Sequence, residues 1–170
     1  MPMIFDRIAI LGVGLIGASI ARAAREYGAV GAIALYDASP DVRERARALG
    51  LGEVFDDAER AVAQADLVVL AVPVGAMGAA AAACARGLKI GAIVTDVGSV
   101  KQAVVDAVAA ALPTSVYFVP GHPLAGTEHS GPDASFATLF QNRWQILTPL
   151  PGQTDAYAAA VDRLEAFWRA

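Results

Sequence analysis

The sequence predicts an α/β protein in which a doubly wound, mainly parallel sheet is flanked by helices. Short apolar runs rich in valine and isoleucine alternate with longer segments of helical periodicity, which is typical of strand-helix-strand units. The run LVVLAV at 67–72 is apolar throughout, as a strand covered on both faces must be. A glycine-rich turn, GVGLIG at 12–17, joins the first apolar run to a helical segment.

The size of the chain favours one domain with a possible extension. Its 170 residues suffice for one buried core. The mean hydropathy is +0.48, but no apolar run approaches the roughly 20 residues that span a membrane. No cationic leader followed by a long apolar core opens the sequence, so we expect a cytoplasmic protein without membrane association.

Charge and composition exclude several functions. The net charge is -4, and 13 basic residues are scattered among 17 acidic ones, so we expect no nucleic-acid surface. The single cysteine, Cys84, supports no disulfide framework and is expected to be a small buried residue. Two histidines and dispersed carboxylates show no metal-ligand spacing, so no metal is expected.

The first segments predict two strand-helix units. Residues 7–12 form a buried strand, residues 15–28 a helix closed by glycine, and residues 32–37 a strand that ends in an acid. A helix follows over residues 40–49. Ser39 can cap this helix, and the proline after it suits the first helical turn.

The middle of the chain continues the alternation. We expect a short edge strand near residues 53–55 and a helix over 58–64. The apolar run at 67–72 is the fourth strand, and residues 74–85 form the next helix.

Two more strands and a helix precede the most unusual stretch of the sequence. Residues 92–97 predict a strand, residues 100–112 a helix rich in alanine and valine, and residues 116–119 a strand. This strand leads into GHPLAGTEHSGP at 121–132, whose glycines and prolines predict an irregular loop.

The last segments suggest a boundary. Residues 143–149 predict a strand, and residues 154–169 a helix whose aromatic stripe favours packing over a cofactor contact. PLPGQTD at 149–155 is a candidate hinge. We expect residues 1–150 to form a dinucleotide-binding domain and residues 151–170 to begin a linker or helix toward a further domain.

The glycine motif is the first chemical signal. Gly12 makes the tight turn, Gly14 lets a pyrophosphate approach the backbone, and Gly17 lets helix and strand pack closely. Leu15 and Ile16 complete the motif beside the helix N-terminus. Its position between a strand and a helix predicts a Rossmann-type dinucleotide site.

An acid at the end of the second strand indicates the cofactor. Asp37 follows Gly17 by about 20 residues, where a carboxylate can accept hydrogen bonds from an adenosine ribose. The same charge repels a 2′-phosphate, and Arg43 is the only nearby arginine, so NAD is expected rather than NADP. In the alternative structural interpretation, the glycines serve only the turn and Asp37 caps the next helix.

Ligands of doubly wound sheets bind at the carboxyl ends of the strands, so segments that follow later strands should reach the same crevice. Ser99 can cap the following helix or offer a hydroxyl to the site, and Lys101 can place a charge near the cofactor or an acid. Further cofactor contacts are expected after the fourth and fifth strands, at Ala71, Val72, Pro73, Asp96 and Gly98.

His122 is the strongest catalytic candidate. It follows a strand end and lies between Gly121 and Pro123, which restrict its backbone so that the imidazole can be aimed reproducibly. A histidine that satisfies only local hydrogen bonds is the alternative. His129 lies in a more open polar stretch and is the weaker candidate.

GVGLIGAS, DVGSVK, GHPLAGTEHSGP and LF…ILTP occur in this order over nearly the whole chain, and together they resemble the prephenate and arogenate dehydrogenases of tyrosine biosynthesis. The resemblance implies an NAD-dependent oxidative decarboxylation of prephenate or arogenate to 4-hydroxyphenylpyruvate or tyrosine. It implies that His122 is the catalytic base and that Ser99 assists it. Thr127 and Glu128 match the family pattern and can orient the substrate loop, whereas His129 occupies a variable position.

The resemblance also implies a helical C-terminal domain that forms a homodimer and contacts the substrate carboxylates. The sequence stops before such a domain, so we expect this polypeptide alone to bind NAD and to turn over poorly. Two alternatives remain open at this point. One is another two-domain NAD(P) dehydrogenase, of the β-hydroxyacid or pyrroline carboxylate type, and the other is a non-enzymatic NAD-binding module.

Overall fold

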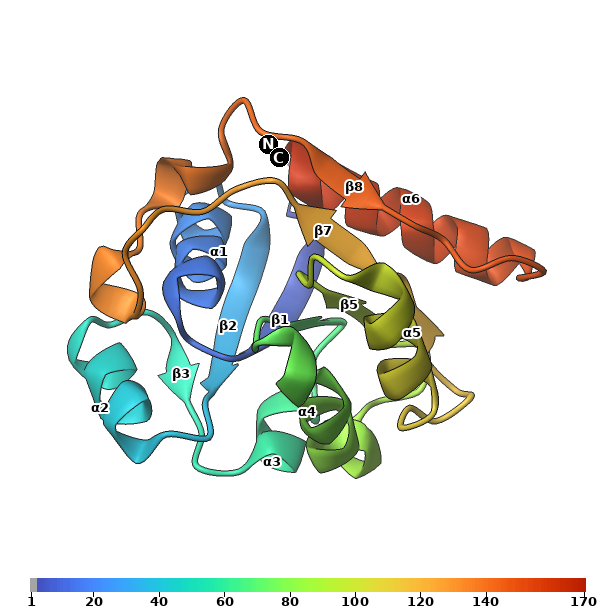
Figure 1. The fold of residues 1–170 in the computed structure, drawn as a ribbon, viewed down its shortest axis with the longest axis horizontal. Coiled ribbons are helices and arrows are strands. Elements are labelled where there is room, and N and C mark those ends of the chain that lie inside the picture. Colours follow the sequence, from blue (N-terminus) through green and yellow to red (C-terminus); the bar gives the residue numbers. More distant parts are fainter. Residues whose placement is uncertain (1–2) are drawn as a thin grey trace.

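A six-stranded parallel sheet runs through the structure, a computed structural model that describes residues 3–170 (Figure 1). The strand order is β3-β2-β1-β4-β5-β6, so the order reverses direction between β1 and β4. Ligand crevices of such sheets lie outside the carboxyl ends of the strands at this switch point. The strands are β1 (Phe5–Leu11), β2 (Val30–Tyr36), β3 (Glu53–Val54), β4 (Leu67–Leu70), β5 (Ile93–Asp96) and β6 (Tyr117–Phe118).

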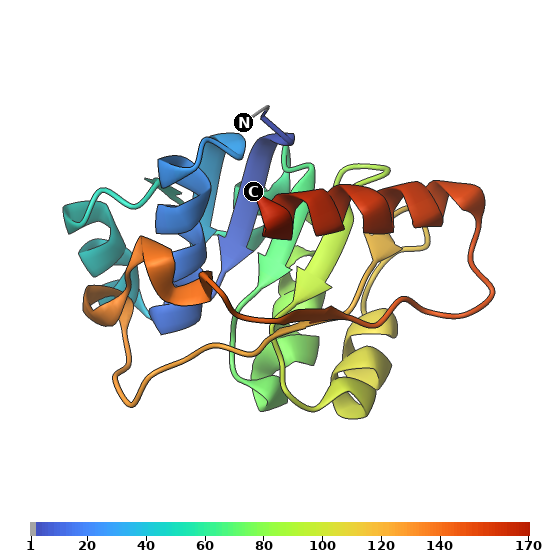
Figure 2. The same cartoon turned by 90° about the horizontal axis from the view of Figure 1, so that it is seen from above.

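Helices cover both faces of the sheet, which confirms the predicted doubly wound architecture (Figure 2). Two apolar cores result, one on each face of the sheet. The first core receives side chains from α1 (Leu15–Glu26), α2 (Pro40–Ala48) and α6 (Asp155–Arg169). The second receives them from α3 (Ala58–Val62), α4 (Met77–Cys84) and α5 (Lys101–Ala109). Within residues 3–170, none of the helices has both the length and the apolar composition needed to cross a bilayer.

Local sequence signals account for most helix boundaries. Ser39 caps α2 as predicted, because its hydroxyl oxygen accepts the backbone N–H of Val42 at 3.4 Å. Thr154 caps α6 in the same way. Gly28 adopts a φ of 67° directly after α1, a conformation that glycine reaches without steric cost, and this confirms the predicted stop.

Two predicted elements differ from the structure. The single helix expected over 74–85 is divided into a 3-10 turn, η1 (Val74–Ala76), and α4, because the chain leaves β4 through Pro73. The stretch at 121–132, expected to be irregular throughout, begins with a strand, β7 (Gly121–Pro123). This strand pairs antiparallel with β8 (Gln145–Leu147) in a separate two-stranded sheet. A proline is tolerated there because the strand is short and at an edge.

The C-terminal helix α6 packs into the first core. Of the predicted stripe, Tyr157 and Leu164 are buried in this core, and Val161 and Trp168 are partly buried against it, which confirms that the stripe serves packing. The Tyr157 hydroxyl donates to the carbonyl oxygen of Phe118 at 2.8 Å and accepts the N–H of Leu150 at 3.0 Å. Two short 3-10 turns, η3 (Pro132–Ala134) and η4 (Ala137–Phe140), pack against α1.

Candidate functional site

The three glycines of the first turn have three different surroundings. Gly12 has a φ of +95°, and a Cβ there would lie 2.5 Å from the carbonyl oxygen of Ala71. A Cβ on Gly17 would collide with the carbonyl oxygen of Gly12. Apart from its chain neighbours, nothing in residues 3–170 lies within 4 Å of the Cβ position of Gly14, so this backbone is open to a ligand. These surroundings match the roles of tight turn, close packing and phosphate approach that the motif predicts.

The N-terminus of α1 is suited to an anion. Gly14 is its N-cap residue and offers no side-chain cap, and the first turn holds no acid. The first-turn amides of a helix have no intrahelical acceptors, and the helix dipole favours negative charge there. Leu15 and Ile16, in this turn, are partly exposed. The loop therefore fits the pyrophosphate of a dinucleotide.

Asp37 braces the glycine turn from the end of β2. Its carboxylate accepts the N–H of Val13 at 2.8 Å and the N–H of Ser39 at 2.9 Å. Each carboxylate oxygen keeps a second lone pair, so the same group can still accept ribose hydroxyls. The alternative that Asp37 caps the next helix is wrong, because Ser39 caps α2. Asp37 instead stabilises the glycine turn and the residue before α2, and this structural role is compatible with a cofactor role.

Arg43, the nearby arginine, is already engaged. Its guanidinium donates to the carbonyl oxygen of Asp37 at 2.8 Å and to the carboxylate of Asp56 at 3.0 Å. Its side chain is only 14% exposed. A phosphate on the adenosine ribose would have to compete with these acceptors.

The end of β4 contacts the glycine turn directly. Ala71 donates its N–H to the carbonyl oxygen of Leu11 at 2.7 Å, and a Cβ on Gly12 would lie 2.8 Å from Val72 Cγ1. Ala71 and Val72 are partly exposed and Pro73 is exposed. The structure therefore brings the predicted residues after β1 and β4 together at the switch point (Figure 1).

Asp96, at the end of β5, is fully buried and surrounded by protein donors. Its carboxylate accepts the N–H of Gly98 at 2.8 Å, the N–H of Gly121 at 3.1 Å and the ammonium of Lys101. Lys101 also donates to the carbonyl oxygen of Gly121. The sequence placed Asp96 among the cofactor contacts, whereas every hydrogen bond that its carboxylate makes in the structure is to this network.

His122 lies on β7 and is partly exposed, between the buried residues Gly121 and Pro123. It faces Ile146 of β8 in the antiparallel register, and the N–H of Leu124 extends the pairing to the carbonyl oxygen of Trp144 at 2.8 Å. The imidazole is therefore carried by a paired strand rather than by a free loop.

Ser99 is exposed and does not cap α5. The N-cap residue of this helix is Val100, and no side chain makes a capping hydrogen bond there. The capping role that the sequence allowed for Ser99 is therefore wrong. Its hydroxyl makes no hydrogen bond to the described residues, which leaves it available to a ligand.

The segment after β7 runs from the two-stranded sheet to η3 beside α1 and α2 (Figure 1). At its far end the carboxylate of Asp133 accepts three hydrogen bonds from the Arg45 guanidinium, and the Ser135 hydroxyl accepts one from Arg22 at 2.7 Å. Between β7 and η3, the Thr127 hydroxyl accepts the N–H of His129 at 3.2 Å, and Glu128 and His129 are exposed. Thr127 and Glu128, which the family resemblance assigns to the substrate loop, thus lie between two anchored parts of the chain, β7 and η3.

Two polar side chains that the sequence analysis did not single out lie beside Gly121. The Thr95 hydroxyl and the Gln145 amide are buried and make no hydrogen bond within the described part of the chain. A Cβ on Gly121 would lie 2.8 Å from Gln145 Nε2 and 3.1 Å from Thr95 Oγ1. The only sequence signal for them is a polar residue within each predicted apolar strand.

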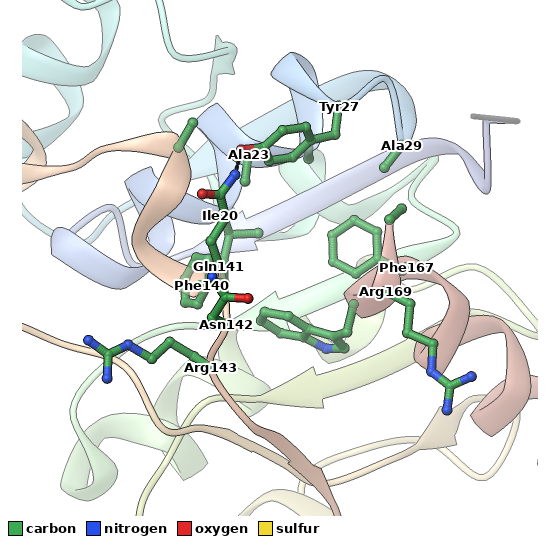
Figure 3. A pocket seen from close by; sticks show the side chains of 14 residues that line it. Ile20, Ala23, Tyr27, Ala29, Phe140, Gln141, Asn142, Arg143, Phe167 and Arg169 are labelled. Atoms are coloured by element: carbon green, nitrogen blue, oxygen red, sulfur yellow. Dashed lines mark hydrogen bonds between the residues drawn. The ribbon is translucent and has the colours of Figure 1, made fainter.

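A separate cavity of about 310 Å³ lies between α1, η4 and the end of α6 (Figure 3). Apolar side chains dominate its wall, among them Ile20, Tyr27, Phe140, Phe167 and Trp168. It contains none of the predicted site residues. Among residues 3–170, no group of three or more histidine, cysteine, aspartate or glutamate side chains is placed to hold a metal.

Comparison with known proteins gives a consistent result. A family profile described as "Prephenate dehydrogenase, nucleotide-binding domain" matches residues 20–170. The cyclohexadienyl dehydrogenase of Zymomonas mobilis is 53% identical over 160 residues, which are 92% of this chain and 54% of that protein. The prephenate dehydrogenase of Bacillus subtilis is 38% identical over 153 residues, which are 88% of this chain and 41% of that protein.

Solved structures show the same relationship. The crystal structure of prephenate dehydrogenase from A. aeolicus, in complex with hydroxyphenyl propionate and NAD+, has a TM-score of 0.83 and 33% identity. This comparison covers 99% of this chain and 57% of that one. Synechocystis arogenate dehydrogenase has a TM-score of 0.79 and 30% identity, and the match covers 95% and 57% of the two chains. The chain thus spans about half the length of the relatives it matches.

Proposed function

This chain belongs to the prephenate dehydrogenase family, and from this premise we propose that it carries the nucleotide site and the catalytic base of an enzyme that oxidatively decarboxylates prephenate or arogenate. Membership assigns a nucleotide cofactor to the domain. The products would be 4-hydroxyphenylpyruvate from prephenate or tyrosine from arogenate. Because the chain spans about half the length of its relatives, the activity is proposed for the complete protein.

The proposal rests chiefly on where His122 lies. Its neighbour Gly121 is bonded to Asp96 at the carboxyl end of β5, the edge of the sheet that also carries the glycine turn after β1. A base on this edge can act on a substrate that lies against the reactive end of a dinucleotide whose pyrophosphate sits at Gly14.

The residues suit the chemistry of a ring carbon that carries both hydrogen and hydroxyl. When bound, a nicotinamide cofactor supplies the acceptor for the hydride. His122, as a neutral imidazole, takes the proton of the hydroxyl while the hydrogen leaves with its electron pair, so that a carbonyl forms. The electron pair of the bond to the departing carbon dioxide then enters the ring and reaches the oxygen. That oxygen regains a proton as the ring becomes aromatic.

Ser99 is proposed to hold the same hydroxyl or the imidazole. Its exposed hydroxyl is free of the helix cap and follows Gly98, whose N–H is bonded to Asp96. A hydroxyl in this position can donate or accept, so it can stay bonded while the proton moves.

We propose NAD as the cofactor in preference to NADP. Asp37 presents a carboxylate at the end of β2, and Arg43 is held by the Asp37 carbonyl oxygen and by Asp56. A 2′-phosphate would meet a negative charge without a free guanidinium. We expect kcat/KM of the complete protein to be higher with NAD than with NADP, and equal values would contradict the assignment.

Other features of the proposal come from the sequence patterns and from the family resemblance. The domain boundary near residue 150, the homodimer, the small-molecule substrate site completed by a further domain, and the cytoplasmic location remain predictions. No observation favours the β-hydroxyacid, pyrroline carboxylate or non-enzymatic alternatives.

The base is tested by exchanging His122 for asparagine in the complete protein. We expect His122→Asn to lower kcat with prephenate or arogenate by about 100-fold or more, because general base catalysis typically contributes that much. His129→Asn is the matched control, since His129 is exposed and pairs only with Glu128. It should leave kcat unchanged.

The affinity of both variants for NAD is also measured by calorimetric titration. Affinity for NAD should be unchanged in each, since neither side chain is part of the proposed nucleotide site. If His122→Asn kept the parent rate, His122 would not be the base.

A further inference from the structure

We propose that Lys101 and Asp96 are positioning residues that hold the backbone next to His122, a role that rests on the proposed function of His122 as the base. The proposal concerns one charged pair at the carboxyl end of β5 and one residue, Gly121, on β7. Neither side chain needs to touch the substrate for this role.

The pair fixes both polar groups of Gly121. The Asp96 carboxylate accepts the N–H of Gly121 at 3.1 Å, and the Lys101 ammonium donates to the carbonyl oxygen of Gly121. The ammonium also binds the carboxylate, so the three groups close a ring. That carbonyl belongs to the peptide group whose nitrogen is that of His122. This peptide group is planar and stiff, so fixing its oxygen also restricts the position of the His122 backbone nitrogen.

Packing prevents Gly121 from moving out of the ring. Its Cα faces Gln145 Nε2, the carbonyl oxygen of Asp96 and Thr95 Oγ1, and a Cβ would lie 2.8, 3.0 and 3.1 Å from them. On the next residue, pairing with Ile146 holds the strand in register. His122 is therefore fixed on one side by the charged pair and on the other by β8.

The burial of the pair favours a positioning role over a purely stabilising one. Asp96 is completely buried and the Lys101 side chain is 21% exposed. Removing two charges from water costs free energy that their attraction repays only with excellent geometry, so apolar side chains could stabilise this position equally well. The pair adds what apolar packing lacks, namely directed hydrogen bonds to both sides of one residue.

A second lysine–aspartate pair provides a control within the same chain. Lys89 donates to Asp66 at 2.5 Å, and Asp66 also accepts a backbone N–H, from Arg7 at 3.1 Å. Asp66 directly precedes β4, so this pair lies at the opposite edge of the sheet from His122. Its loss should affect stability without affecting the site.

The experiment compares Lys101→Met, Lys101→Arg and Asp96→Asn with the control Lys89→Met in the complete protein. We expect Lys101→Met and Asp96→Asn to lower kcat about 10- to 100-fold, as expected for a misplaced catalytic group. The dissociation constant for NAD, measured by calorimetry, should change by no more than about twofold, because the pyrophosphate site is at the helix α1 N-terminus. Lys101→Arg should recover most of the rate, and Lys89→Met should keep it.

The amide signal of Gly121, observed by NMR, gives a readout independent of activity. In Lys101→Met it should shift and its hydrogen exchange should become faster, whereas in Lys89→Met it should not change. Unchanged kcat in Lys101→Met would overturn the proposal. The proposal would also be overturned if Lys101→Met bound NAD more weakly but kept the parent kcat at saturating NAD, because Lys101 would then be a cofactor ligand.

Two arms keep the test decisive if a variant does not fold or if His122 is not the base. In the unaltered protein, the Gly121 amide should be as protected from hydrogen exchange as the amides of β5. Rapid exchange would overturn the proposal that Asp96 and Lys101 hold Gly121. If His122→Asn keeps full activity while the Gly121 amide behaves as expected, the assignment of the base fails and the positioning of residue 122 stands.

Discussion

Gly121 is enclosed so closely that even a methyl group would displace its neighbours. A Cβ would lie 2.8 Å from Gln145 Nε2 and 3.0 Å from the carbonyl oxygen of Asp96. We expect Gly121→Ala to lower the free energy of unfolding by about 1 to 3 kcal/mol, the usual cost of overpacking, and to reduce kcat of the complete protein. Urea unfolding and steady-state kinetics measure the two effects.

Gly126 is the matched control for this substitution, since it lies in the same segment and no atom is within 4 Å of its Cβ position. Gly126→Ala should change the free energy of unfolding by less than about 0.5 kcal/mol. Equal effects at both positions would show that Gly121 is not enclosed as described.

Cys84 is completely buried on α4, as its sequence context predicts. Burial raises the pKa of its thiol from 9.0 to about 11. Because the folded pKa lies above the unfolded one, the unfolded state loses its proton first. This contribution to stability is present below pH 9 and is lost as the pH rises toward 11.

We therefore expect the parent protein to lose about 1.4 kcal/mol more of its free energy of unfolding than Cys84→Ala between pH 8 and pH 10. Urea titrations of both proteins at the two pH values measure this difference. Parallel losses in the two proteins would contradict the raised pKa.

At the scale of elements, the hydroxyl of Tyr157 bonds α6 to the sheet in addition to the apolar contacts of this helix. The hydroxyl of Tyr157 joins the carbonyl oxygen of Phe118, the last residue of β6, to the N–H of Leu150. We expect Tyr157→Phe to destabilise the fold by about 1 to 3 kcal/mol, since the buried carbonyl oxygen of Phe118 and the half-buried N–H of Leu150 would lose their partner. Tyr27→Phe, which removes an exposed bond to Gln141, should cost less than about 0.5 kcal/mol. Thermal or urea unfolding distinguishes the two, and equal losses would refute the role of Tyr157.

The elements also show where sequence patterns reach their limit. The strands and the capped helices follow from periodicity and local capping residues such as Ser39 and Thr154. β7 was not predicted because its hydrogen-bond partner, β8, comes more than twenty residues later and its own residues favour turns. Ser99 was a reasonable capping candidate, but the chain enters α5 one residue later, at Val100.

At the scale of the molecule, the predicted residues gather at one edge of the sheet, where the strand order reverses. The residues proposed to bind the nucleotide all lie in this chain, whereas the family resemblance assigns the substrate carboxylates to a further domain. We expect the 170-residue chain to bind NAD with a dissociation constant close to that of the complete protein. Its rate with prephenate should be at least about 100-fold lower, because the substrate would not be oriented.

Calorimetry with NAD and a nicotinamide absorbance assay measure these two quantities. Efficient turnover by the 170-residue chain would contradict the prediction, and so would a much weaker affinity of this chain than of the complete protein for NAD.

The sequence by itself determined the alternation of strands and helices, the glycine turn with its acid at the end of the second strand, and His122 as the strongest catalytic candidate. These features are local, since each depends on residue types within one segment. Only the tertiary structure decided that Asp96 and Lys101 hold Gly121, that Thr95 and Gln145 enclose it, and that His122 stands on a paired strand. Such contacts join residues far apart in the chain, and their distances depend on how strands and helices pack.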